Sequence, residues 1–261
     1  MHSLLLLTAL AAPLAPPASA PEPPAAPSRE VREPVRFSAG ERLTYTVRFG
    51  PMKVGTGSME ITGVERVRDR DAFHAVFRLS GGTLFYKVND VLESWIDTTS
   101  LVSLRFVKDQ REGRRERATH FEIFPERRRY AEAGREERES VDAPLDDASF
   151  LYFVRTLPLE VGATYELDRY FKPDRNPVTV HVARRERITV PAGTFDALVL
   201  RPTIRTSGLL AESKKTEVWL SDDEHRVVLR VASKLPFGTI SLQLASYELA
   251  AGTGMLASLV E

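Results

Sequence analysis

The feature that most constrains this sequence is a repeated alternation of apolar and polar residues, clearest over residues 216–247. Side chains in a β-strand point alternately to opposite faces, so a strand with one buried face alternates in this way. Three alternating segments lie in this stretch, separated by turn-like clusters at residues 222–224 and 236–238. Asp, Pro and Gly favour chain reversals. The stretch therefore predicts an antiparallel β-meander.

The same pattern recurs along most of the chain, from residue 43 to residue 200. Gly55 and Gly57 thin one segment, which predicts a bulge, sharp curvature or a close backbone approach. Many short alternating strands with regular turns predict an all-β fold with minor helix. We expect an antiparallel meander that forms a curved sheet, a partly closed barrel or a sandwich. No internal repeat is evident by inspection.

One stretch breaks the alternation. Over residues 148–157 the apolar residues recur three and four positions apart, as one face of a helix requires. We predict one short helix near residues 147–157, with Asp146 or Asp147 capping its start and Pro158 ending it. We expect this helix to pack against the sheet or to plug it.

Length and composition bound the organisation of the chain. The 261 residues show no composition break over residues 36–249, which predicts a single β-rich domain followed by a C-terminal tail at 250–261. The chain has no cysteine, which excludes disulfides and thiolate metal sites. Lys plus Arg and Asp plus Glu are equal at 36 each, so no net charge favours nucleic acid. The dense mixed charge over residues 110–140 predicts solvated hairpin tips, with a patch for an anionic polymer as the alternative.

The N-terminal residues predict export. A short apolar run at residues 4–12, too short to span a membrane, precedes Ala18-Ser19-Ala20, a small-x-small cleavage pattern. We predict a signal peptide at 1–20, although no Lys or Arg precedes the run, and a disordered Pro/Ala-rich linker at 21–35. With no cysteine for lipid attachment and no later membrane-spanning segment, we expect a soluble protein that is periplasmic or secreted and not a lipoprotein.

Several segments taken together resemble one family. The chain is similar, over roughly residues 37–248, to the bacterial exported family called domain of unknown function 3108. The resemblance implies an exported or envelope β-protein with no established activity, and it supplies no catalytic residues. The matching segments are Gly40-Glu41-Arg42-Leu43-Thr44-Tyr45, Gly55-Thr56-Gly57, Leu92-Glu93-Ser94-Trp95-Ile96-Asp97, Val190-Pro191-Ala192-Gly193-Thr194-Phe195-Asp196, Glu217-Val218-Trp219-Leu220-Ser221-Asp222-Asp223 and Ser233-Lys234-Leu235-Pro236-Phe237-Gly238.

No catalytic motif stands out, and no catalytic residue, metal site or cofactor is predicted. His225 adjoins three acids, but residues of one turn cannot all converge on one ion, so a solvated turn is favoured. Glu93 and Asp97, which flank Trp95, are the only candidate acid pair for glycoside cleavage. Ordinary polar positions on a strand and its turn are the favoured explanation for both residues.

The remaining hypothesis is binding. A closed or strongly curved sheet can enclose a ligand, and aromatic residues would line its cavity or fill its core. We expect a non-catalytic envelope protein that binds a lipid or another apolar or amphipathic small molecule.

The alternatives are a structural protein in an envelope assembly and, least favoured, a glycan-active enzyme. A deep apolar cavity would favour the first, a filled core with an exposed apolar patch the second, and a polar cleft with two carboxylates the third. The candidate ligand-binding residues are Tyr45, Tyr86, Trp95, Trp219 and Phe237, although burial in the core is favoured for Trp219.

Overall fold

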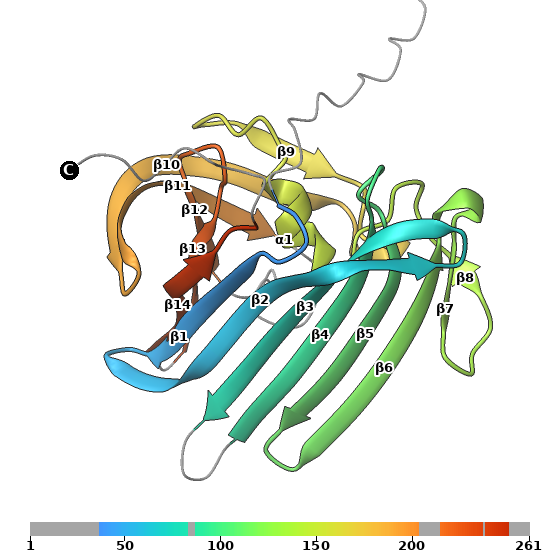
Figure 1. Ribbon diagram of the computed structural model, residues 1–261, viewed down its shortest axis with the longest axis horizontal. Coiled ribbons are helices and arrows are strands. Elements are labelled where there is room, and N and C mark those ends of the chain that lie inside the picture. The colour runs from blue at the N-terminus through green and yellow to red at the C-terminus, as the bar shows by residue number, and fades with distance from the viewer. Residues whose placement is uncertain (1–36, 83–86, 204–214, 237, 251–261) are drawn as a thin grey trace, which may run out of the picture. The chain divides into compact units, whose positions relative to one another are not determined.

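The computed structural model describes residues 37–82, 87–203, 215–236 and 238–250, which all belong to one compact unit. Fourteen strands of this part form one antiparallel sheet (Figure 1). The first strand pairs with the last at the middle of the sheet, and each half is a meander running outward from there. The strands, in sheet order, are β8 (Arg138–Glu139), β7 (Arg129–Glu132), β6 (Arg115–Phe124), β5 (Ser103–Glu112), β4 (Lys87–Asp97), β3 (Arg70–Gly82), β2 (Met52–Val67), β1 (Arg42–Phe49), β14 (Gly238–Glu248), β13 (Val228–Leu235), β12 (Lys215–Ser221), β11 (Gly193–Thr203), β10 (Val178–Val190) and β9 (Thr164–Leu167).

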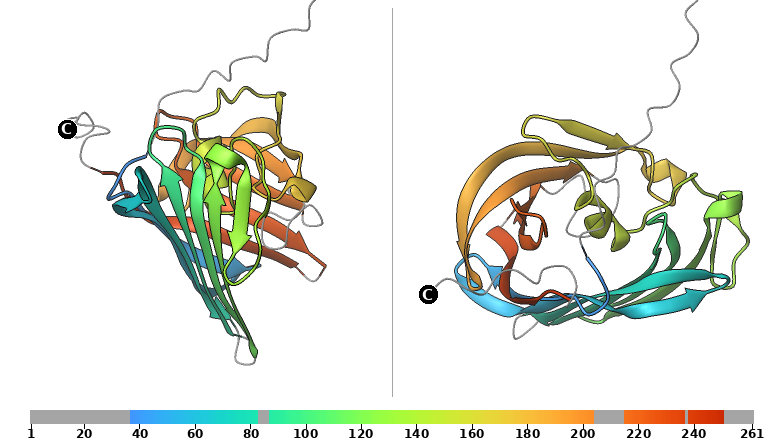
Figure 2. Two further views of the ribbon diagram at one scale, coloured as in Figure 1. Left: turned by 90° about the vertical axis from the view of Figure 1, so that its right-hand side faces the viewer. Right: turned by 45° about the horizontal axis from the view of Figure 1, so that its top comes forward.

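The sheet is curved and does not close on itself, because β8 and β9 remain as its two edges. Figure 2 shows the curvature, with the helix on the inner side. The expected all-β fold, an antiparallel meander in a curved sheet with one short helix, is therefore confirmed. The close backbone approach expected near Gly55 is present, since a Cβ atom there would lie 2.3 Å from the carbonyl oxygen of Ser80.

The helix, α1 (Ser149–Val154), is completely buried. Asp146 caps its start as predicted, because one carboxylate oxygen accepts hydrogen bonds from the amides of Ala148 and Ser149 at 2.8 and 2.9 Å. The predicted C-terminal boundary is wrong, since the helix ends four residues before Pro158. Beyond Val154 the chain turns through Arg155 and Thr156, and the amide of Thr156 donates a hydrogen bond to the carbonyl oxygen of Phe153. A tight turn of this kind ends the helix without a proline.

The helix joins the two halves of the sheet. On the β10–β12 side, Leu151 and Val154 border a space of only about 10 Å³ together with Val180, Leu200 and Val218. The β4–β5 side is polar instead, because hydrogen bonds join Ser94 to Asp146 and Ser103 to Ser149 at 2.6 and 2.8 Å. The apolar space beside the helix is therefore filled by side chains.

A buried ion pair fixes the C-terminal end of α1 against the start of β1. Arg155 donates two hydrogen bonds to the Glu41 carboxylate, at 2.6 and 2.8 Å, and one to the carbonyl oxygen of His225 at 3.0 Å. Both charged side chains are at most 2% exposed. Removing one partner of such a pair costs about 3–5 kcal/mol, because the other charge remains buried.

The β10–β11 hairpin curls back on the sheet. The amide of Ala192, in its turn, donates to the carbonyl oxygen of Leu244 on β14 at 3.0 Å, and Phe195 packs against Tyr247. Three strands separate β10 from β14 in the sheet, so this contact bends β10–β14 into a tight curl, visible in Figure 1. One face of these five strands is concave as a result.

Several predictions concern parts of the chain outside the described residues. The signal peptide at 1–20, the linker at 21–35 and the tail beyond Ala250 fall there and stay predictions. Within the described ranges, no helix has the length and apolar character needed to cross a membrane.

Candidate functional site

A cleft of about 690 Å³ opens on the concave face of the β10–β14 curl. Among the described residues, its lining combines one indole ring with six charged groups, four of them cationic and two of them carboxylates. Residues from each of the five strands contribute to its wall. The lining residues are Arg184, Glu186, Arg201, Pro202, Thr203, Thr216, Glu217, Trp219, Arg230, Ala232, Lys234 and Thr239.

Strand alternation explains why these side chains gather. Val218 and Leu220 border the space beside α1, so Trp219 and Glu217 point to the opposite face. Directly across the β12–β13 ladder, Trp219 pairs with Arg230 and Glu217 with Ala232. Side chains of directly opposed residues lie on the same face of a sheet. The register therefore places Arg230 of β13 beside the indole.

Both carboxylates of the cleft are already bound. Arg184 donates to both oxygens of Glu217, at 3.0 and 3.2 Å, and its Nε donates to Glu186 at 2.8 Å. Arg201 donates a further hydrogen bond to Glu217, at 2.9 Å, and the Trp219 indole N–H donates to Glu186. Two carboxylates thus share two guanidinium groups and one indole.

These hydrogen bonds fix the charge of the two acids. Above all the hydrogen bond from Arg184 lowers the pKa of Glu217, with Arg201 adding to the effect. The same guanidinium lowers the pKa of Glu186, and the Trp219 indole contributes. Both acids are therefore ionised at neutral pH. A glycosidase pair needs one carboxyl that stays protonated to act as the acid, and neither acid here meets that need.

The two cations on β13 are not neutralised in this way. No carboxylate among the described residues pairs with Arg230 or Lys234. The Arg230 guanidinium lies over the Trp219 ring, 4.8 Å from its centroid, and its buried Nε has no hydrogen-bond partner in this part of the chain. Among the described residues, the lining of the cleft therefore carries an excess of two positive charges beside an aromatic ring.

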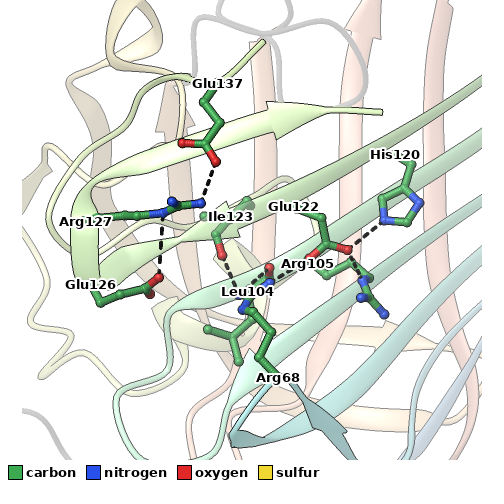
Figure 3. A network of polar contacts seen from close by, with 9 residues as sticks. All are labelled: Arg68, Leu104, Arg105, His120, Glu122, Ile123, Glu126, Arg127 and Glu137. Atoms are coloured by element: carbon green, nitrogen blue, oxygen red, sulfur yellow. Dashed lines mark hydrogen bonds and ion pairs between the residues drawn. The ribbon is translucent and has the colours of Figure 1, made fainter. Parts of the chain in front are cut away.

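Trp95 has matching surroundings in the other half of the sheet. Its indole N–H donates to Glu65 at 2.7 Å, and the guanidinium of Arg105, its cross-strand partner, lies 5.3 Å from the ring centroid. Here, however, Arg105 Nε donates to Glu122 on β6 at 2.6 Å. Figure 3 shows Glu122 held between Arg68, Arg105 and His120. The cation beside Trp95 is thus neutralised.

The correspondence extends to the strand register. We call β2–β6 the Trp95 unit and β10–β14 the Trp219 unit. In each, a bulge in the first strand lies opposite the residue that pairs with the tryptophan, His74 in one unit and Val199 in the other. A second register shift directly follows each tryptophan. The chain thus contains two copies of one five-strand arrangement, which inspection of the sequence missed because the shared residues are few and widely spaced.

The structure separates the residues predicted to bind a ligand. Trp219 lines the cleft and is 5% exposed, so it is both a core residue and a wall of the cleft. Tyr45 is buried in the main core, where its hydroxyl donates to the carbonyl oxygen of Val228 at 3.0 Å. Trp95 belongs to a second, smaller cluster. Tyr86 and Phe237 lie outside the described residues.

The candidate acids flanking Trp95 have structural partners. Glu93 binds His74 at 2.9 Å. Asp97 pairs with Arg70 and accepts hydrogen bonds from the amides of Thr99 and Ser100, which holds the turn after β4. In the portion of the chain described, no cluster of His, Asp and Glu residues suits a metal ion.

The cleft residues that sequence analysis missed are mainly Arg184, Arg201, Arg230 and Lys234. Glu217 lies on the same face as Trp219, as strand alternation requires, and both line the cleft. The missing signal was the register between strands. Without it, an arginine on β10 or β13 cannot be assigned to the neighbourhood of the indole.

Comparisons with known proteins agree with the fold. Among solved structures, a β-barrel-like protein of domain of unknown function DUF1849 from Brucella abortus is 8% identical, with 82% of this chain and 99% of that chain covered and a TM-score of 0.56. A protein described as a candidate lipoprotein from Parabacteroides distasonis is 11% identical, with 82% and 98% covered and a TM-score of 0.35. At such low identity, the first of these likenesses concerns the fold alone. A search of curated proteins finds no match.

The family model described as protein of unknown function (DUF3108) matches residues 44–245, which include Trp95, Trp219 and the whole lining of the cleft. The resemblance found in the sequence is thereby confirmed, and the chain belongs to the DUF3108 family.

Proposed function

We propose that this chain is an exported, non-catalytic envelope protein whose Trp219 cleft binds an amphipathic molecule through an anionic group. Arg230 carries the proposal. It is a cation beside an indole ring, with a buried Nε that no described residue satisfies. An anionic group of a ligand in the cleft would supply the missing counter-charge.

The energetics favour an anion at this position. A buried polar group without a hydrogen bond costs free energy, and a charge-assisted bond to an oxyanion is about twice as strong as a neutral one. Lys234 lines the same cleft and adds a second cation. Glu186 and Glu217 cannot neutralise the pair, because Arg184 and Arg201 occupy them.

The aromatic side of the cleft suits an apolar portion of the same ligand. Trp219 and Ala232 contribute apolar surface next to the cations. The volume of about 690 Å³ falls within the range of roughly 300–1,000 Å³ usual for small-molecule sites. The space beside α1, by contrast, measures only about 10 Å³. An amphipathic ligand at the open cleft is therefore better supported than a wholly apolar ligand inside the fold.

Export is supported by the N-terminal sequence, a short apolar run followed by Ala18-Ser19-Ala20. The two carboxylates of the cleft invite the glycan-active alternative, but both are held ionised by Arg184, which weakens it. In the described part of the chain, the large apolar side chains that are exposed come from β2, a loop and β14, namely Met52, Val64, Val161 and Tyr247. They give the assembly alternative no specific support.

Native mass spectrometry tests the proposal. The mature protein is purified without detergent from the envelope of its own host, and its mass is compared with that of Arg230→Gln prepared identically. We expect an adduct of an anionic amphipathic molecule on the wild type, and at least about a tenfold lower occupancy on the variant, since one charge-assisted hydrogen bond is worth about 1.5–3 kcal/mol.

Arg187→Gln is the matched control. Arg187 lies on β10 of the same curl, its side chain is 73% exposed and it does not line the cleft, so its removal changes the net charge equally without touching the site. Equal occupancy in the wild type and Arg230→Gln would refute the proposed site. A wild-type mass without any adduct, repeated after titration with an anionic lysophospholipid, would refute binding of this class.

A further inference from the structure

A second, smaller pocket lies in the other half of the sheet, on the face of β5–β6 that points away from Trp95. Its floor consists of three cross-strand pairs: Phe106 with Phe121, Lys108 with Thr119, and Gln110 with Arg117. Its roof is the segment that follows β9 and carries Tyr170, Phe171, Lys172 and Arg175. The pocket measures about 100 Å³.

The charge of this pocket is of one sign. Lys108, Arg117, Lys172 and Arg175 line it, and no carboxylate from the described ranges does. This differs from the Trp219 cleft, whose lining includes two acids. A pocket whose charged side chains are all cationic repels cations and attracts an anion, and low-dielectric aromatic walls strengthen that attraction.

The four cations differ in whether a carboxylate forms an ion pair with them. Lys108 is held by Asp147 at 2.7 Å, and the same carboxylate accepts a hydrogen bond from the Tyr170 hydroxyl at 2.8 Å. Arg175 lies 3.5 Å from the exposed Asp174. Lys172 and Arg117 form no ion pair with any residue of the described ranges.

Lys172 is the most constrained of the four. Its ammonium packs over the rings of Phe121 and Phe171, 4.3 and 5.1 Å from their centroids. Burial lowers the pKa of Lys172, and the neighbouring charge of Arg175 lowers it further. The fold therefore keeps a half-buried cation next to another cation, an arrangement that a bound anion would stabilise.

We propose that this pocket binds a single tetrahedral oxyanion of the phosphate type, either free or as the terminal group of a phosphate monoester. Lys172 and Arg117 supply cations that form no ion pair within the described residues, Lys108 and Arg175 add N–H donors, and Thr119 adds a hydroxyl. The volume is about three times the roughly 30 Å³ that one water molecule occupies in the liquid. One phosphate group fits that space, whereas a larger ligand would have to extend into solvent.

Isothermal titration calorimetry in a buffer of low chloride tests the site. Inorganic phosphate and glycerol 3-phosphate are titrated separately into the wild type, Lys172→Gln, Arg117→Gln and Arg114→Gln. Arg114 is the matched control, because it lies at the exposed turn of the same β5–β6 hairpin and does not line the pocket. Arg117 is exposed, so its variant keeps the fold even if Lys172→Gln perturbs packing.

We expect the wild type and Arg114→Gln to bind phosphate equally. Lys172→Gln should weaken binding by at least about tenfold and Arg117→Gln by about three- to tenfold, in line with the loss of charge-assisted hydrogen bonds. Binding of both probes identifies a pocket open to monoesters, and binding of phosphate alone identifies a site for the free ion. Absence of wild-type binding up to about 10 mM, a concentration at which even a Kd near 1 mM would saturate the site, overturns the proposal. Equal affinity in the wild type and both pocket variants does so as well.

Discussion

The Trp95 unit and the Trp219 unit use the same three side chains in the same arrangement. In each, an indole N–H donates to a glutamate of the first strand, and an arginine directly across the ladder lies over the ring. The units differ in the next strand. The residue opposite Arg105 is Glu122, whereas the residue opposite Arg230 is Gln243. One change from an acid to an amide leaves the second arginine without a counter-charge.

The same contrast continues along the strand that carries the arginine, β5 in one unit and β13 in the other. Four residues beyond Arg105 lies Asp109, and four residues beyond Arg230 lies Lys234, at the equivalent place on the same face. The first unit thus pairs the arginine beside its indole with a carboxylate, which suits a structural role. The second keeps an excess of cations at the open end of a curl, which suits recognition of an anion. The two units share one strand register but differ in charge, so register alone does not create a binding site.

The largest effect should come from the two rings themselves. Trp95→Ala and Trp219→Ala should each lower the free energy of unfolding by about 3–5 kcal/mol, because both side chains are at most 9% exposed and leave a void. Denaturant unfolding followed by circular dichroism measures both. Only Trp219→Ala should also remove the adduct from the native mass spectrum. A loss below about 1 kcal/mol for either variant would show that its ring contributes little to the core.

A second difference should appear in the dependence of stability on pH. On the side of the sheet that faces α1, Ser94 and Ser103 of the Trp95 unit form hydrogen bonds with the buried Asp146. The Trp219 unit has the apolar Val218 and Leu220 on that side instead. Burial raises the pKa of Asp146 from 3.8 to about 6. Because the folded pKa exceeds the unfolded value, the folded state holds the proton between about pH 4 and pH 6.

Raising the pH through that range should therefore lower the free energy of unfolding, by up to about 3 kcal/mol from this group. Asp146→Asn keeps an oxygen that can accept the helix amides and removes the titration. The difference in stability between the wild type and the variant, measured by urea unfolding from pH 4 to pH 7, should fall as the pH rises. Carboxylates whose pKa is lowered, such as Glu122 and Glu217, lose their contribution only at more acidic pH and do so in both proteins. Parallel curves would mean that Asp146 does not titrate in this range.

Exchanging the residues opposite the two arginines tests the comparison directly. Glu122→Gln should cost about 0.5–1 kcal/mol, because the carboxylate that binds Arg68 and Arg105 is part-exposed. Gln243→Glu should change stability by no more than about 1 kcal/mol, since it supplies a partner for Arg230. It should nevertheless remove the bound anion, whereas Glu122→Gln should leave it in place. Retention of the adduct in Gln243→Glu would show that the free charge of Arg230 is not what binds it.

The smallest effect on stability is expected at the rim of the cleft. Lys234→Asp gives the Trp219 unit the residue type that the Trp95 unit has at Asp109, and it should change stability by less than about 0.5 kcal/mol, as is usual for exposed positions. Ligand occupancy should still fall, because a negative charge replaces a positive one beside Arg230. Thermal unfolding and native mass spectrometry on one preparation separate the two effects. Unchanged occupancy would restrict the site to the indole and Arg230.

The sequence by itself determined the strands, the single helix and the family. Apolar alternation reports which side of a strand is buried, and a helical spacing at residues 148–157 reports one buried face, so local patterns were enough for these elements. The Asp146 cap was also predictable, because a capping carboxylate acts within three residues of the amides it binds. Segments outside the alternation, such as the N-terminal residues, carried the prediction of export.

Only the tertiary structure decided which side chains meet. Trp219, Arg184 and Arg230 come from three strands, and their approach depends on two register shifts and on the curl that brings Ala192 to Leu244. A shift of one residue in any ladder would turn an arginine to the opposite face. Alternation is a property of each strand alone, whereas register is a property of pairs distant in sequence. For that reason the two matching units, the unbalanced charge of one of them and the cationic pocket on β5–β6 became visible only in the folded chain.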